Sequence, residues 1–236
     1  MMENGLQKKL AAGEMDLKTI GILLAMFALA AIFWNTYLIY PIKLFVVVLH
    51  EFSHGLAAVL TGGRIVRIEI DPRIGGVCYT AGGVRLIVAS AGYLGSILWG
   101  GLILLIAVRT KHDNILGMVI GGLLVLLAAL YIRNLFGFLF TIGFGATLAL
   151  ISYAAKNALV DLVMKFLGMT SCLYVLIDIK EDLIDRTNIG SDADAIARLL
   201  GSQSLSLTVG VAWIGIAVCA FGFFLWLARR GESRTA

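Results

Sequence analysis

Charged residues are scarce in this chain of 236 residues: Asp, Glu, Lys and Arg make up 14% of it, against 60% hydrophobic residues. A soluble domain usually carries about a quarter charged residues, so the composition excludes an ordinary soluble globular protein. The net charge is only +4, and the basic residues are scattered beside apolar runs, which excludes a nucleic-acid-binding surface. Most of the chain is therefore expected to lie in a lipid bilayer.

Cysteine and histidine are also rare, with three of each. Cys78, Cys172 and Cys219 share no CxxC spacing, which argues against a disulfide framework and against a thiolate metal site. We interpret these cysteines as small apolar packing residues. Two of the three histidines, His50 and His54, stand together inside an apolar run, where ionisable side chains are costly.

Apolar runs long enough to cross a bilayer, which takes about 20 residues, recur along the sequence. They predict an α-helical polytopic membrane protein with about seven transmembrane helices, forming a single domain over residues 1–236. The predicted spans lie near residues 18–40, 42–62, 86–108, 114–132, 134–155, 160–179 and 207–228. The first run follows a segment of mixed charge, and we interpret it as a retained anchor rather than a cleaved signal peptide.

Two stretches do not fit membrane spans. Residues 63–83, "GRIVRIEIDPRIGGVCYTAGG", alternate apolar and charged side chains around a Pro and Gly-Gly turn, which predicts a β-hairpin between the second and third spans. Residues 180–206 are polar, and "SDADAIARLLG" within them predicts a short amphipathic helix with Ser191 as its N-cap. The balance of Lys and Arg in the loops places both stretches and the N-terminus in the cytosol.

The apolar run "VVVLHEFSHGLAAVL" carries the clearest chemical motif. In a helix, His50 and His54 lie one turn apart on the same face, so both imidazoles can bind one metal ion. Zinc accepts histidine nitrogens and, in catalytic sites, keeps one position for water. Glu51 stands beside the first histidine, where it can take a proton from that water. The HExxH pattern therefore predicts one zinc ion per chain, with Glu51 as the general base.

A catalytic zinc site needs a third protein ligand, and no third histidine lies in a span. We predict Asp178, because the second and sixth spans run in the same direction and place Asp178 at the depth of the histidine pair. Asp182, one helical turn further, is the alternative ligand or an outer hydrogen-bonding group. Asp161 lies at the opposite end of its span and is rejected.

These features resemble the site-2 protease family of intramembrane zinc metalloproteases. The resemblance extends from Phe45 to Leu200 and includes "HEFSH", the hairpin, and a third span in which Gly92, Ser96 and Gly100 recur at four-residue spacing. The chain looks most like the compact bacterial and plant-type branch, whose recurring pieces appear here as "TGGRIVRIEI", "GGVCYTAGG", "AGYLG", "RNLFG" and "SDADAIARLLG". The family's third ligand is usually an aspartate in a Leu-Asp-Gly setting, whereas Asp178 stands in "IDI".

The resemblance implies a hydrolase that cleaves peptide bonds of transmembrane protein substrates, with His50 and His54 as zinc ligands and Glu51 as the catalytic base. It also implies a multi-pass protein of the bacterial plasma membrane. The hairpin offers a strand edge for an unwound substrate, or it is a structural loop. The alternatives are an inactive membrane scaffold or partner subunit that retains the metal motif, and a transporter, although no repeated halves are visible. The sequence defines neither the substrate nor the oligomeric state.

Overall fold

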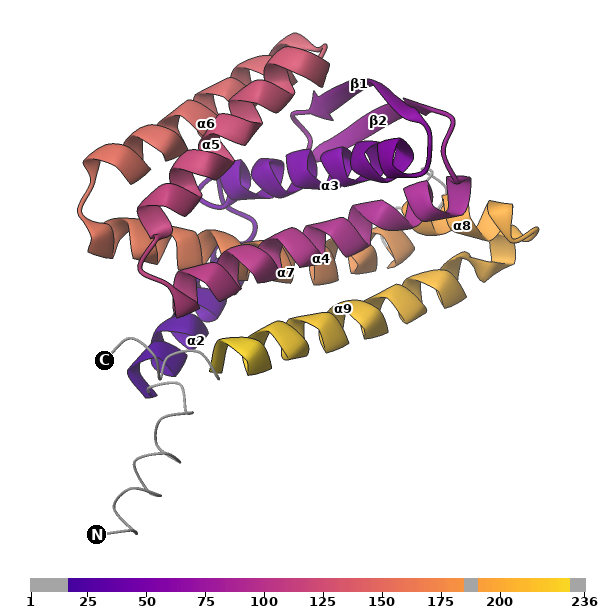
Figure 1. Ribbon diagram of the computed structural model, residues 1–236. Helices are drawn as coiled ribbons and strands as arrows, with labels where there is room; N and C mark the ends of the chain where they lie inside the picture. The colour runs from indigo at the N-terminus through magenta and orange to yellow at the C-terminus, as the bar shows by residue number, and fades with distance from the viewer. Residues whose placement is uncertain (1–16, 185–190, 230–236) are drawn as a thin grey trace, which may run out of the picture.

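The computed structural model of the protein describes residues 17–184 and 191–229 (Figure 1). Within these ranges the chain forms helices joined by short connections, with one small antiparallel sheet. The elements are α2 (Leu17–Ile32), α3 (Tyr40–Leu60), β1 (Arg64–Asp71), β2 (Gly75–Ala81), α4 (Arg85–Arg109), α5 (Asp113–Tyr131), α6 (Leu135–Ala154), α7 (Asn157–Ile184), α8 (Asp192–Leu199), the 3-10 helix η1 (Gln203–Leu205) and α9 (Ser206–Arg229).

Six helices among the described residues are long and apolar enough to cross a membrane: α3, α4, α5, α6, α7 and α9. The predicted polytopic helical class is confirmed, and the predicted number of about seven spans is close. The difference is the first predicted span, 18–40, in which the helix ends at Ile32. The 16 described residues of α2 span about 24 Å, against roughly 30 Å for a hydrocarbon core. In the turn that follows, the Thr36 hydroxyl group donates a hydrogen bond of 2.7 Å to the Phe33 carbonyl oxygen.

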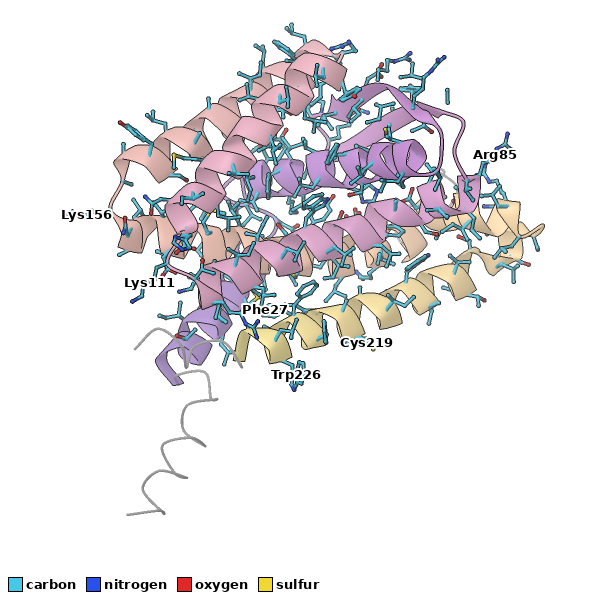
Figure 2. All side chains as sticks on the ribbon, in the orientation of Figure 1. Phe27, Arg85, Lys111, Lys156, Cys219 and Trp226 are labelled. Carbon is cyan, nitrogen blue, oxygen red and sulfur yellow. The ribbon has the colours of Figure 1, made fainter. Side chains whose placement is uncertain are left out.

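Helix α3 is the centre of the bundle, lying between the α5–α6 pair and helices α4 and α7 (Figure 1). Within its most apolar 18-residue window, 72% of residues are buried inside the protein, against 28% for α5 and α6 and 17% for the last span. The outer helices therefore present their apolar side chains outward, as lipid-facing helices do, and Cys219 and Trp226 of α9 point away from the bundle (Figure 2). Ionisable groups on α3 are consequently held inside protein.

Small residues let α4 approach its neighbours closely, as small residues do between membrane helices. A β-carbon added at Gly100 would lie 2.9 Å from the Ser171 side chain and 3.0 Å from the Cys172 backbone nitrogen of α7. Ser96, one turn earlier on α4, is 1% exposed. The four-residue spacing of small residues thus fits α4 tightly against α7.

The predicted β-hairpin is confirmed, with β1 and β2 antiparallel and a turn at residues 72–74. It packs beside the C-terminal half of α3, near the start of α4 (Figure 1). Ile68 and Ile70 are almost completely buried, whereas Val66 is half exposed. The period-two pattern therefore buries one side of β1 only from Ile68 onward, because the register shifts at an irregularity between Ile65 and Arg67, where Val66 lies.

Helix α8 lies in the polar segment between α7 and α9. Ser191 is its N-cap, and its hydroxyl oxygen accepts a hydrogen bond of 3.2 Å from the backbone N–H of Asp194. The Asp194 carboxylate in turn accepts a 2.5 Å hydrogen bond from the Ser206 hydroxyl at the start of α9. These two bonds fix the start of α8, where Asp192 is the first helical residue.

Candidate metal centre

The two histidines of the HExxH motif point at the same carboxylate. His50 and His54 lie one turn apart on α3, and the Nε2 atom of each is 3.2 Å from Oδ2 of Asp192 at the start of α8. Among the described residues, these three side chains form the one group whose possible ligand atoms all lie within 4.8 Å of one another. The group therefore joins a membrane-spanning helix to a short helix of the polar segment.

The ring of His54 is oriented by a bond on its far side. Its Nδ1 atom lies 2.7 Å from the Val88 carbonyl oxygen of α4, which can only accept a hydrogen bond. Nδ1 therefore carries a proton, which leaves Nε2, the nitrogen that faces Asp192, as the one available to a metal ion. This arrangement, in which a second contact fixes the tautomer of a ligating histidine, is typical of metal sites. The His50 ring packs edge-on against Tyr93, with ring centroids 5.5 Å apart.

The space between the three side chains fits a metal ion. A β-carbon added at Gly92 would lie 2.4 Å from Asp192 Oδ2, 2.4 Å from His50 Nε2 and 2.5 Å from His54 Nε2, so only glycine leaves this space open. The buried Oδ2 atom of Asp192 has no hydrogen-bond partner among the described residues. Two ligand atoms that each lie about 2.0–2.1 Å from a tetrahedral zinc ion are about 3.3 Å from one another. The Nε2 atoms of His50 and His54 each lie 3.2 Å from Asp192 Oδ2, which is close to that distance.

The electrostatics of Asp192 agree with a ligand role. Burial by itself would raise the pKa of the Asp192 carboxyl, but the adjacent His54 and His50 side chains hold that pKa well below its usual range. The carboxylate is therefore ionised, as a metal ligand must be.

Glu51 lies beside the histidine pair and is enclosed by the hairpin. Its side chain is 6% exposed. A β-carbon added at Gly76 of β2 would lie 2.7 Å from Glu51 Cγ and 2.9 Å from its Oε1, and the backbone of Cys78 is within hydrogen-bonding reach of the carboxylate. The carboxylate thus occupies a narrow space between α3 and β2, next to the first histidine.

The third member of the group differs from the sequence prediction. Asp178 of α7 was predicted to close the histidine pair, but it does not belong to the three-residue group, and Asp192 takes that position. Asp178 is half-buried and near enough to act electrostatically on His50. Asp178 as a ligand stays a prediction, and the group that the structure brings together instead includes Asp192 of α8, which packs against α4 and α9.

The two other aspartates considered from the sequence are accounted for separately. The side chain of Asp182 lies outside the described residues. Asp161, rejected as a ligand, pairs with Lys165 at 2.5 Å one turn further along α7. One sequence feature could have pointed to Asp192 as a candidate ligand. It directly follows the predicted N-cap Ser191, in the segment "SDADAIARLLG" that carries part of the resemblance.

Comparison with known proteins supports a peptidase assignment. A family model described as Peptidase M50B-like matches residues 23–228, from α2 to the end of α9, and therefore includes both the histidine pair and Asp192. No curated protein and no solved structure matches the chain. The match agrees with the resemblance to site-2 proteases, and the M50 peptidases are in general zinc-dependent. Together with its apolar helices, the match makes the chain an integral membrane protein that belongs to the Peptidase M50B-like family.

Proposed function

We propose that this chain is an intramembrane zinc metalloprotease that hydrolyses peptide bonds of transmembrane proteins. One observation carries the proposal: two histidines of a membrane-spanning helix and Asp192 direct three ligand atoms at one small space, with Glu51 beside it. Three protein ligands and an open position are the pattern of a catalytic zinc, whereas structural zinc usually has four protein ligands.

His50, His54 and Asp192 would hold the ion. Bound there, zinc would lower the pKa of a water molecule towards 7 and would polarise the scissile carbonyl group. Glu51 would act as the general base, taking a proton from the attacking water as the water oxygen bonds to the carbonyl carbon. Glu51 would then give that proton to the amide nitrogen as the C–N bond breaks, leaving a carboxylic acid and an amine, and the proton of the acid would pass to the amine. The enclosure of Glu51 by the hairpin keeps its carboxylate in place for both transfers.

A transmembrane substrate must unwind before its carbonyl group can be attacked, because a helix hides its carbonyls in its own hydrogen bonds. We propose that the edge of β2 binds the unwound segment by strand addition. The outer edge of β1 is already paired, since Ile68 bridges Ile132 and the Arg133 N–H donates to the Ile68 carbonyl oxygen at 3.0 Å. β2 pairs with β1 alone among the described strands.

An apolar groove between α3 and α4 supports a substrate of this kind. The groove has a volume of about 570 Å³, and its lining includes Ser53 and Ala57 of α3, Ala91 and Gly95 of α4, and Trp213 of α9. The α3 residues flank His54 in sequence, and the α4 residues flank Gly92. An apolar segment arriving from the bilayer can therefore lie next to the metal centre without exposing polar groups to lipid.

The test combines metal analysis with cleavage of a model transmembrane peptide by the purified protein. Wild type should hold one zinc per chain, and His50→Ala and Asp192→Asn should lose most of it. Glu51→Gln should keep zinc but turn over about 10²–10⁴-fold more slowly. The control is Asp161→Asn, which also replaces an aspartate carboxylate by an amide but lies outside the metal group. This variant should retain both its zinc and its turnover.

Two results would contradict the proposal. Zinc binding without cleavage would favour the inactive scaffold that keeps the metal motif. Full zinc content in Asp192→Asn together with loss in Asp178→Asn would restore Asp178 as the third ligand and leave Asp192 outside the site.

A further inference from the structure

We propose that Asn134 is a positioning residue that fixes the β-hairpin and, through Gly76, the carboxylate of Glu51. The role of Glu51 as the base rests on the proposed function above. Asn134 lies in the turn between α5 and α6 and does not belong to the metal group. It is connected to Glu51 by a short series of contacts.

The side chain of Asn134 has an unusual partner for its place in the chain. Asn134 is the N-cap residue of α6, where an asparagine side chain normally accepts a hydrogen bond from the first turn of its own helix. Here it makes no such bond. Its Oδ1 instead accepts from the Ile70 N–H at 3.0 Å, and its Nδ2 donates to the Ile70 carbonyl oxygen at 2.8 Å. The amide group therefore pairs with β1 as a neighbouring strand would.

The surroundings of Asn134 are shaped to hold this pairing. A β-carbon added at Gly137 would lie 2.6 Å from Asn134 Oδ1 and 3.0 Å from the Ile70 β-carbon, so glycine leaves room for the contact. Ile70 is 1% exposed, and its backbone groups would have no access to water as a replacement partner. Buried backbone groups are nearly always paired, so the Asn134 amide supplies bonds that β1 cannot obtain elsewhere.

The hairpin transmits this position to Glu51. Ile70 pairs with Gly76 in the sheet register, and Gly76 is the residue that closes against the Glu51 side chain. The hairpin also packs closely against α3 at a second point. A β-carbon added at Gly55 of α3 would lie 2.6 Å from Ile65 Cδ1 of β1. A shift of the hairpin away from the α5–α6 turn would therefore move the surface that confines the Glu51 carboxylate, while leaving the zinc ligands in place.

The experiment uses the full-length purified protein and the variant Asn134→Ala. Asn114→Ala is the matched control, because the Asn114 side chain also donates to a backbone carbonyl, that of Ser152, but at the far end of α5. Zinc content, turnover of a transmembrane peptide and alkylation of Cys78 are measured for each. The alkylation is done in a Cys172→Ala, Cys219→Ala background, so that only the thiol of β2 reacts.

Asn134→Ala should keep one zinc per chain, lower kcat by about 10–100-fold, as expected for a misplaced catalytic group, and speed Cys78 alkylation about tenfold by loosening the hairpin. Asn114→Ala should change none of these. In a Glu51→Asp background, where the base is already displaced, Asn134→Ala should lower kcat less than about threefold, because the two effects are coupled.

Unchanged Cys78 alkylation in Asn134→Ala would overturn the proposal, as would an equal loss of kcat in the wild-type and Glu51→Asp backgrounds. If Asn134→Ala does not fold, Asn134→Asp carries the same test, since it keeps the acceptor for the Ile70 N–H and removes the donor. An inactive wild-type protein would instead refute the proposed protease function. The alkylation rates would then still decide whether Asn134 holds the hairpin.

Discussion

Gly92 is a residue of α4 at which an added side chain would enter the candidate metal centre. Gly92→Ala would place a methyl group 2.4–2.5 Å from all three ligand atoms. Since each of these atoms would have to move, we expect zinc occupancy to fall to a small fraction of the wild-type value. Metal analysis of the purified variant measures this directly.

The control is Gly122→Ala on α5, where an added β-carbon has no atom within 4 Å. That substitution should leave zinc unchanged and should stabilise the helix slightly, because alanine is a better helix former than glycine by about 1 kcal/mol. Full zinc occupancy in Gly92→Ala would show that the metal does not bind between these three side chains.

Cys78 reports the charge of Glu51. Burial, and then the nearby Glu51 carboxylate, raise the pKa of the Cys78 thiol to about 12. Glu51→Gln removes the negative charge that disfavours the thiolate, so the thiol pKa should fall and alkylation near pH 8–9 should become several-fold faster. The rate of alkylation as a function of pH measures the shift.

Glu69→Gln is the matched control for this prediction, because Glu69 also belongs to the hairpin but pairs with Arg67 at 2.7 Å. In the register Cys78 is opposite Ile68, so Glu69, the next residue, projects from the other face of the sheet. A Cys78 rate that is the same in Glu51→Gln and wild type would mean that Glu51 is not charged beside this thiol.

The local part of the candidate site was predictable from sequence, and the tertiary part was not. His50, Glu51 and His54 stand in one helix, whose period alone brings both imidazoles to one face. Asp192 is more than 130 residues away in sequence, and its place depends on how the segment after α7 folds back. Asp178 was chosen by comparing depths within the predicted membrane spans. Such a comparison cannot consider a residue that lies outside the spans, as Asp192 does.

At the scale of elements, α8 carries Asp192, the proposed third ligand of the metal centre. Ser191→Ala removes the N-cap bond to Asp194, which typically costs about 1 kcal/mol of helix stability. Because metal binding is coupled to the folding of its site, zinc affinity should fall about fivefold. Competition with a chelator of known affinity measures the change.

Ser202→Ala serves as the control for the cap. Ser202 lies just beyond α8, where its exposed hydroxyl group forms a hydrogen bond of 2.7 Å with that of Ser204. The Ser202→Ala variant should bind zinc with the same affinity as the wild-type protein. Equal affinity in Ser191→Ala and Ser202→Ala would show that the orientation of α8 does not depend on its cap.

Elements with a strong local sequence pattern were predicted correctly. Features that depend on packing against distant segments were not predicted. The hairpin follows from alternating side chains and a Pro and Gly-rich turn, and the "RN" break between the fourth and fifth predicted spans does separate α5 from α6. The end of α2 at Ile32 breaks an apolar run that hydropathy alone would continue. The pairing of Asn134 with Ile70 depends on the packing of two distant segments and leaves no local signal.

At the scale of the whole molecule, the basic side chains divide between two ends of the bundle. Arg85 lies at the end that carries the hairpin and α8, and Lys111 and Lys156 lie at the opposite end (Figures 1 and 2). The Lys and Arg balance of the sequence predicts that the hairpin end is cytosolic. The metal centre would then open towards the cytosolic leaflet, and substrates would be cut near that side.

Single cysteines, introduced into a protein from which the three native cysteines have been removed, test this orientation. Arg73→Cys lies in the exposed hairpin turn, and Lys156→Cys lies in the exposed connection between α6 and α7. In intact cells an impermeant thiol reagent should label Lys156→Cys at once and Arg73→Cys only after the membrane is opened. The reverse labelling would place the hairpin and the metal centre on the outer side, because α3 and α4 fix both at the same end.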